Sequence, residues 1–218
     1  MRLRFRATEL GIGLLCLCVG VAAGCEKTTG GSATPVTSRP PDPAEPVPGV
    51  EVTLPDHIPP NAVACMPPPP TSGSMARAAV ADPVAPVIVT PLPDGWNSTT
   101  GSGDVALTST GPEGMSVKVT ITPTDLDPGG AFLRYATDLR TAKPDVRLTV
   151  APAQFCGYSS QLLNGTIGSG TAFADRITHI WTNTRAYLVV IHLEGLAGAP
   201  GFDAAKSTVT QQFAVVIP

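Results

Sequence analysis

Hydrophobic and polar residues alternate most regularly in the stretch MSVKVTITP. Met115, Val117, Val119 and Ile121 are apolar, and a polar side chain separates each from the next. A period of two predicts a β-strand with one buried face. The stretch DVALTST at 104–110 also has strand character, and the turn residues GPEG connect the two stretches. The pattern therefore predicts a β-hairpin.

A helical period follows this hairpin, with apolar residues three or four positions apart. These apolar residues are Phe132, Tyr135, Ala136 and Leu139. Their spacing is typical of an amphipathic helix with one face on the core. Asp127 is a suitable N-cap, and Pro128 suits the first helical position. Pro144 ends the helix, because proline cannot continue it.

Strand-like stretches fill most of the rest of the C-terminal part. They lie at 86–92, 145–152, 158–167, 175–182, 186–195 and 213–217. Turn residues at 168–170 and 183–185 predict an antiparallel meander, and 202–212 has the spacing of a second helix. The chain is therefore predicted to have an α+β fold, an antiparallel β-sheet flanked by two or more helices.

The N-terminus has the pattern of an export signal. Three arginines within the first six residues precede an uncharged apolar stretch at 10–24, which is too short for an ordinary membrane span. The stretch ends in VAAGCEK, which resembles the bacterial lipobox. That resemblance implies cleavage of a signal peptide at 1–24 and a diacylglycerol on Cys25, so the mature chain is expected at the extracytoplasmic face of the cell membrane. An ordinary secretory signal followed by a chance cysteine is the alternative.

Composition divides the mature chain into a linker and a folded domain. Residues 26–72 contain 13 of the 24 prolines and no aromatic residue. Such a segment cannot bury enough apolar surface to offset its ordering entropy, so we expect 25–79 to be a disordered, proline-rich linker. Both tryptophans and all three tyrosines lie within 80–218, which is the predicted folded domain.

The charge of the mature chain argues against nucleic acid as a partner. Without residues 1–24 the chain has 11 basic and 16 acidic residues, which gives a net charge of −5. The basic residues are scattered singly, whereas a protein that binds phosphates needs a basic stripe.

Two thiols remain once the signal is removed and Cys25 is acylated. They are Cys65 and Cys156, and an even number in an oxidising compartment predicts one disulfide between them. Two free thiols are the alternative. The bond is expected to fasten the end of the linker to the folded domain.

The sequence does not indicate catalytic chemistry. His57 lies in the linker, while His179 and His192 share strand faces with apolar residues, where a structural histidine is commoner than a ligand. If the strands that carry His179 and His192 pair through the turn at 183–185, the two histidines could approach one another, but no Cys or carboxylate cluster completes a zinc site. We therefore expect no catalytic residue, no metal and no cofactor, and we expect that the protein is not an enzyme.

Three further motifs have structural interpretations that outweigh the catalytic ones. Cys156, Ser159 and Ser160 lie close together, but no base is identified for a nucleophile. Asp125 and Asp127 precede a helix and are better explained by capping than as an acid and base pair. The glycines of GTIGSG lack the Lys-Ser/Thr of a phosphate loop and predict a hairpin turn. An exported hydrolase that uses Ser159, Ser160 or His192 remains a distant alternative.

Several motifs in order resemble those of the mycobacterial LpqN/LpqT-type lipoproteins. They are LPDGW at 92–96, TDLDPGGAF, FCGYSSQLLNG at 155–165 and AYLVVIHLEG, after a lipobox and a Thr/Pro-rich linker. The resemblance implies a PsbP/Mog1-like sandwich and an exported lipoprotein of an actinobacterial cell envelope. It supplies no catalytic residue. Cys65 in the linker and Cys156 in the domain depart from the family's pattern.

Two functions follow as hypotheses. The first is binding of an apolar or glycolipid ligand in a groove between sheet and helices, for which Trp96, Tyr135 and Trp181 are candidate contact residues. The alternative is an interaction or scaffold module for an envelope or host protein, with the linker setting its reach.

Overall fold

The computed structural model describes residues 47–51, 63–66, 72–153 and 155–218. The predicted signal peptide, Cys25 and His57 lie outside the described residues, as does most of the predicted linker. No helix within the described ranges has the length and hydrophobicity needed to span a membrane.

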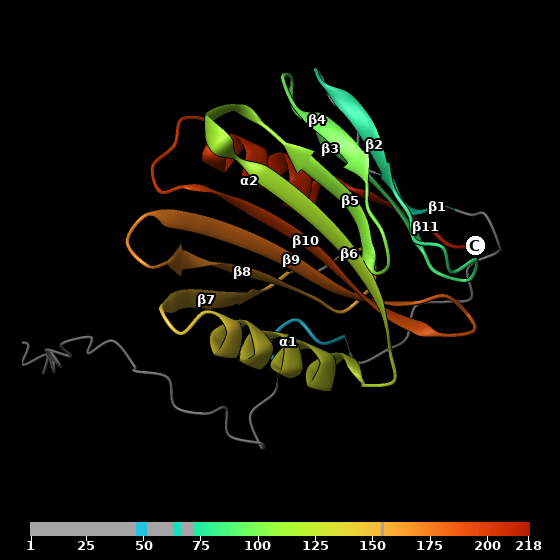
Figure 1. The fold of residues 1–218 in the computed structure, drawn as a ribbon. Helices are drawn as coiled ribbons and strands as arrows, with labels where there is room; N and C mark the ends of the chain where they lie inside the picture. Colours follow the sequence, from blue (N-terminus) through green and yellow to red (C-terminus); the bar gives the residue numbers. More distant parts are fainter. Residues whose placement is uncertain (1–46, 52–62, 67–71, 154) are drawn as a thin grey trace, which may run out of the picture. The chain divides into compact units, whose positions relative to one another are not determined.

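The described residues form eleven strands, two α-helices and one short 3₁₀ turn (Figure 1). The strands are β1 (Val63–Cys65), β2 (Ser74–Ala78), β3 (Val87–Leu92), β4 (Asn97–Thr100), β5 (Val105–Thr110), β6 (Ser116–Thr124), β7 (Val146–Pro152), β8 (Ser160–Ile167), β9 (Thr171–Trp181), β10 (Ala186–Leu196) and β11 (Ala214–Val216). The helices are α1 (Pro128–Ala142) and α2 (Phe202–Gln211), and the 3₁₀ turn is η1 (Pro112–Gly114). This confirms the predicted α+β class.

A seven-stranded antiparallel sheet is the centre of the fold. Its order is β4-β5-β6-β10-β9-β8-β7, so the predicted hairpin is β5–β6 and the predicted meander runs from β7 to β10. In Figure 1, α1 covers one face of this sheet, while α2 and the second sheet lie against the other. The alternation predicted for β6 separates the two faces, because Val117, Val119 and Ile121 are buried in the core on the α2 side.

Helix α1 begins where the sequence predicted. The Asp127 side chain accepts a hydrogen bond from the Gly130 amide at 2.7 Å, and Pro128 occupies the first turn. Phe132 and Ala136 are buried, and Phe132 joins a cluster with Leu163, Phe173, Ile177 and Val190 of the sheet. The helix thus packs on the sheet through the stripe that its periodicity indicated.

A four-stranded sheet, in the order β1-β11-β3-β2, forms a second layer that the sequence did not predict. Strands β1 and β2 lie before residue 80, in the stretch that composition assigned to the linker. β2 alternates exposed Met75 and Arg77 with buried Ala76 and Ala78, so small apolar residues place it in the core despite its lack of aromatic residues. The folded part therefore begins earlier than composition suggests.

A disulfide joins Cys65 of β1 to Cys156, with a Cα–Cα distance of 5.9 Å. Beside it, the ring of Phe155 stacks on that of Phe213, with centroids 3.9 Å apart. The bond thus connects the edge of the four-stranded sheet to the loop that precedes β8.

Residues 47–51 also lie against the folded domain. The Gly49 carbonyl accepts the amide of Ser160 at 2.8 Å, and the Glu51 amide donates to Ser159 Oγ at 2.8 Å. Gln161 Nε2 donates to the Pro48 carbonyl at 2.7 Å, and Val47 packs against the cluster under α1. A piece of the predicted linker is therefore fixed to β8 through its backbone.

Candidate functional site

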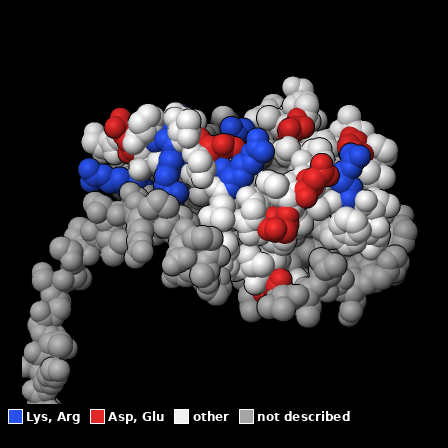
Figure 2. All heavy atoms as spheres, turned by 90° about the horizontal axis from the view of Figure 1, so that it is seen from below, with Lys and Arg blue, Asp and Glu red and all other residues white. Residues whose placement is uncertain are grey.

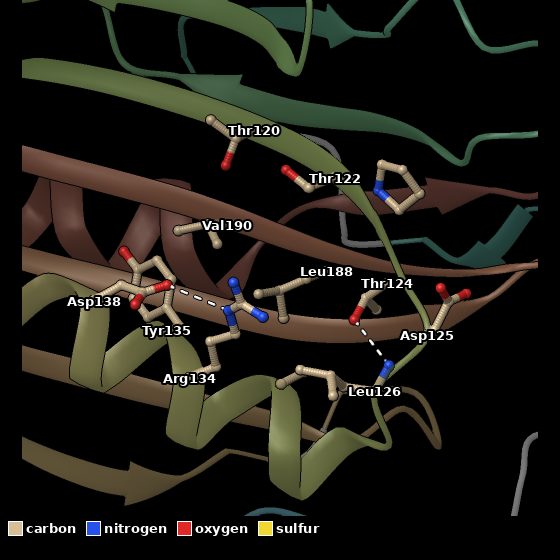
Figure 3. Close-up of a pocket in the computed structure, with 12 residues that line it drawn as sticks. Thr120, Thr122, Thr124, Asp125, Leu126, Arg134, Tyr135, Asp138, Leu188 and Val190 are labelled. Atoms are coloured by element: carbon tan, nitrogen blue, oxygen red, sulfur yellow. Dashed lines mark hydrogen bonds and ion pairs between the residues drawn. The ribbon is translucent and has the colours of Figure 1, made fainter.

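A groove of about 660 Å³ lies between α1 and the face of β6 and β10 (Figure 3). Its lining comprises Thr120, Thr122, Pro123, Thr124, Asp125, Leu126, Ala131, Arg134, Tyr135, Asp138, Leu188 and Val190. This volume falls within the range of pockets that hold small organic ligands.

The groove has an apolar floor and a hydroxyl-bearing wall. Leu188 and Val190 of β10 and Ala131 of α1 supply apolar surface. Thr120 and Thr122 supply the wall, because the alternation that buries Ile121 on the α2 side turns its neighbours toward the groove. Figure 3 shows both threonines above the floor, with the α1 side chains opposite. Such a surface suits a ligand with an apolar part and a polar part.

Charged groups contribute little net field to the groove. Arg134 Nε lies 3.7 Å from Asp138 Oδ2, one turn along α1, and both side chains are mostly exposed. An exposed pair of this kind is worth less than about 1 kcal/mol. Asp125 adds a further carboxylate to the lining. Figure 2, which views the side of the molecule where α1 lies in Figure 1, shows acidic and basic side chains interspersed over this face. The lining therefore holds two carboxylates and one guanidinium, with no surplus of positive charge to favour an anion.

Local hydrogen bonds shape the loop at one end of the groove. The Leu126 amide donates to Thr124 Oγ1 at 3.2 Å, and His179 Nε2 donates to the Leu126 carbonyl at 3.0 Å. Burial lowers the pKa of His179, and this outweighs the Leu126 bond and the charge of Asp127. His179 thus has a structural role as a neutral donor under the loop.

Next to the groove, four polar side chains form what we call the Asp175 cluster, namely Tyr135, Asp175, His192 and Glu194. The Tyr135 hydroxyl donates to Asp175 Oδ2 at 2.8 Å, and His192 Nδ1 donates to Asp175 Oδ1 at 2.5 Å. His192 Nε2 lies 3.4 Å from Glu194 Oε2. Asp175 is fully buried, so these two donors replace water around its carboxylate.

The cluster raises the pKa of both Tyr135 and His192, which keeps the first neutral and favours the charged form of the second. Burial, then the charge of Asp175 and its hydrogen bond, raises the pKa of Tyr135 and keeps the phenol protonated. Burial alone would lower the pKa of His192, but the hydrogen bonds and charges of Asp175 and Glu194 outweigh it and raise that pKa. The cluster thus favours a neutral tyrosine beside a protonated imidazole.

The structure separates the two histidines that sequence spacing suggested might meet. In the β9–β10 hairpin, His179 is opposite Leu188 and His192 is opposite Asp175. Four positions along a strand correspond to about 13 Å. No group of three His, Cys, Asp or Glu suited to a metal ion occurs within the described ranges.

The other residues singled out from sequence have structural surroundings. Ser160 Oγ donates to the Ile177 carbonyl at 2.7 Å, while Ser159 Oγ accepts from Glu51. Of the aromatic candidates, Trp96 is buried in the main core, Trp181 is 38% exposed at the end of β9, and Tyr135 lines the groove.

Sequence reasoning missed Asp175 as a site residue. A signal was present, because an aspartate in a stretch with Phe173, Ile177 and Ile180 must find partners once that strand is buried. Of the groove lining, the sequence analysis named Tyr135 but not Thr120 or Thr122, which are ordinary residues for the polar face of a strand.

Comparison with known proteins supports the fold. No protein-family model matches this chain, and no curated protein matches it. Among solved structures, the crystal structure of LpqN, involved in cell envelope biogenesis of Mycobacterium tuberculosis, matches with a TM-score of 0.53 and 18% sequence identity. The match covers 66% of this chain and 91% of the LpqN chain. At this identity the likeness shows a shared fold, which agrees with the resemblance noted in the sequence.

Proposed function

We propose that this chain, which has the fold of LpqN, is an exported lipoprotein of a bacterial cell envelope that binds an apolar or glycolipid ligand without catalysing a reaction. The binding site is the groove between α1 and the sheet, and the anchor is a lipid on Cys25. The involvement of LpqN in cell envelope biogenesis supports this location. The export signal and lipobox of this chain support it independently.

The groove is the observation that carries the proposal. Its floor of Leu188 and Val190 would accept an alkyl chain, and the hydroxyls of Thr120 and Thr122 would hydrogen-bond a polar head. The charged lining groups are Asp125, Asp138 and Arg134, so carboxylates outnumber the guanidinium. An uncharged head is therefore preferred to an anionic one with the same chain.

A filling substitution tests the groove directly. Thr122→Trp places an indole in the groove, while Thr108→Trp makes the same change on the same sheet face, on β5 and outside the groove. The probe is dodecyl maltoside below its micelle concentration, measured by calorimetry on the full chain, with dodecyl phosphate as the anionic comparison. We expect binding to the parent and to Thr108→Trp, weaker binding of the phosphate, and loss of binding in Thr122→Trp. Equal binding by the two variants would refute the groove as the site.

The anchor has its own test. Cys25→Ala should prevent labelling by radioactive palmitate and release the chain from the membrane fraction, because retention requires the acyl chains. Cys16→Ala is the matched control and should behave as the parent. Labelling that survives Cys25→Ala would overturn the lipobox assignment.

A protein-interaction module is the second candidate function. Within the described residues, β7 pairs only with β8, and its Val150 side chain is 37% exposed. An edge strand of this kind can pair with an extended segment of a partner. Crosslinking in cells that captures one stoichiometric protein and no lipid would favour this candidate over the groove.

A further inference from the structure

Three secondary-structure elements meet at Asp175. The carboxylate belongs to β9, the phenol of Tyr135 comes from α1, and the imidazole of His192 comes from β10. Among the hydrogen bonds described above, the one from Tyr135 to Asp175 is the only one that joins the middle of α1 to the sheet. The rest of that contact is apolar and centres on Phe132. The cluster therefore lies at the contact between α1 and the sheet.

Apolar side chains surround the Asp175 carboxylate within the sheet. On the same sheet face, Asp175 is opposite Leu163 of β8 and lies between Phe173 and Ile177 on its own strand, and all three are buried and apolar. A buried carboxylate without a counter-charge is strongly unfavourable. Of the two groups described above as hydrogen-bonded to Asp175, the His192 imidazole is the one that can carry a positive charge.

We propose that the Asp175 cluster is a proton-dependent attachment of α1 to the sheet, which is strong when His192 is protonated and weaker when it is neutral. The groove beside α1 would then widen as the imidazole loses its proton, because Tyr135 lines the groove and is bonded to the same carboxylate. This inference concerns the helix alone and stands whether or not the groove binds a lipid.

The direction follows from the groups that face His192. Asp175 faces it from β9 and Glu194 lies on its own strand, and both favour the protonated form. Lys118 is opposite it on β6 and disfavours that form, but Lys118 is exposed to solvent. From α1 the titratable neighbour is Tyr135, which stays neutral, while Arg134 and Asp138 are paired with one another. Because the pKa of His192 is raised, its stabilising effect is present at acidic pH and is lost as pH rises through that raised value.

Hydrogen exchange measured by mass spectrometry on the full chain tests this attachment. Exchange of α1 peptides is followed from about pH 5.5 to about pH 8.5 and corrected for intrinsic exchange, with peptides from β3 as an internal reference. We expect the opening of α1 to increase with pH in the parent while β3 does not change. In His192→Gln the side chain is always neutral, so opening should be high and independent of pH.

Two matched tyrosine variants distinguish an effect of the Asp175 cluster on α1 from a general loss of stability. Tyr135→Phe removes the bond to Asp175, and Tyr187→Phe removes a comparable 2.7 Å bond from Tyr187 to Asp82 at another site. Loss of a hydrogen bond to a charged group should increase the opening of α1 about tenfold or more in Tyr135→Phe. Tyr187→Phe should keep the parent's opening of α1 and its dependence on pH.

Two results would overturn the proposal. One is a parent protein whose α1 opening does not change with pH, which needs no variant to fold. The other is a Tyr135→Phe protein in which α1 exchanges as slowly as in Tyr187→Phe.

Discussion

The disulfide between Cys65 and Cys156 should contribute several kcal/mol to stability. The two cysteines are 91 residues apart in the sequence. In the chain-entropy model, closing a loop of that length costs the unfolded chain about 4.6 kcal/mol of conformational freedom near 25 °C. The double variant Cys65→Ser/Cys156→Ser lacks this constraint, so its unfolded state gains entropy and its free energy of unfolding should fall.

The structure makes 4.6 kcal/mol an upper limit. β1 is only three residues long and, among the described strands, pairs with β11 alone, with an irregular register between Val63 and Cys65. Without the bond, β1 can detach locally while the rest of the domain stays folded, so part of the constraint is lost before global unfolding. We therefore expect a loss of about 2 to 4.6 kcal/mol, or roughly 4 to 18 °C in Tm for a chain of this size.

Urea unfolding of the full chain, followed by tryptophan fluorescence, measures this difference. The parent is compared with and without reductant, and the double variant serves as the control on which reductant should have no effect. The slope of the free energy against urea should also increase in the variant, because its unfolded state exposes more surface. A difference below about 1 kcal/mol, or an equal effect of reductant on the double variant, would show that the bond does not stabilise the fold.

Three further predictions concern single residues. Asp127→Ala removes the cap that accepts from Gly130 and should cost about 1 kcal/mol in urea unfolding, whereas Asp127→Asn should retain most of that stability. Gly111→Ala would place a Cβ 2.3 Å from the indole of Trp96, so it should cost about 1 to 3 kcal/mol and change the fluorescence of that buried side chain; an unchanged spectrum would contradict this packing. Because burial lowers the pKa of His179, the unfolded chain takes up a proton below about pH 6.5 before the folded one does, so stability should fall on acidification less in His179→Gln than in the parent.

Local patterns determined most of the elements correctly. α1 could be predicted because Asp127, Pro128 and the spacing after them specify both where a helix begins and which face is buried. β6 could be predicted because its apolar residues alternate without exception. In each case the decisive interactions lie within one element or one turn, so residues close together in the sequence specify them.

Strand β2 of the four-stranded sheet and strand β4 of the seven-stranded sheet could not be predicted in the same way. β2 contributes only Ala76 and Ala78 to the core, and β4 is the fully exposed sequence NSTT, so neither shows a hydrophobic run. Both are held by pairing with strands that do, β3 and β5. Composition therefore placed the start of the domain too late, because it measures apolar content and not backbone hydrogen bonding.

The Asp175 cluster is an intermediate case. The predicted turn at 183–185 would pair position 175 with Leu193, whereas the observed register pairs Asp175 with His192, so the sequence brings the two strands together but misses the partner by one position. Tyr135 is different, since nothing in its own stretch shows that its hydroxyl meets a carboxylate 40 residues later. That contact depends on where α1 crosses the sheet, which is a property of the packed fold.

The fixed segment at 47–51 would shorten the reach of the domain from the proposed anchor. With an anchor at Cys25, only 22 residues lead to Val47, and a fully extended chain of that length spans at most about 79 Å. A linker that extended freely to residue 79 would span at most about 194 Å. With the proposed anchor, the backbone bonds to Ser159 and Ser160 would keep the domain closer to the membrane and raise its effective concentration toward binding partners at that surface.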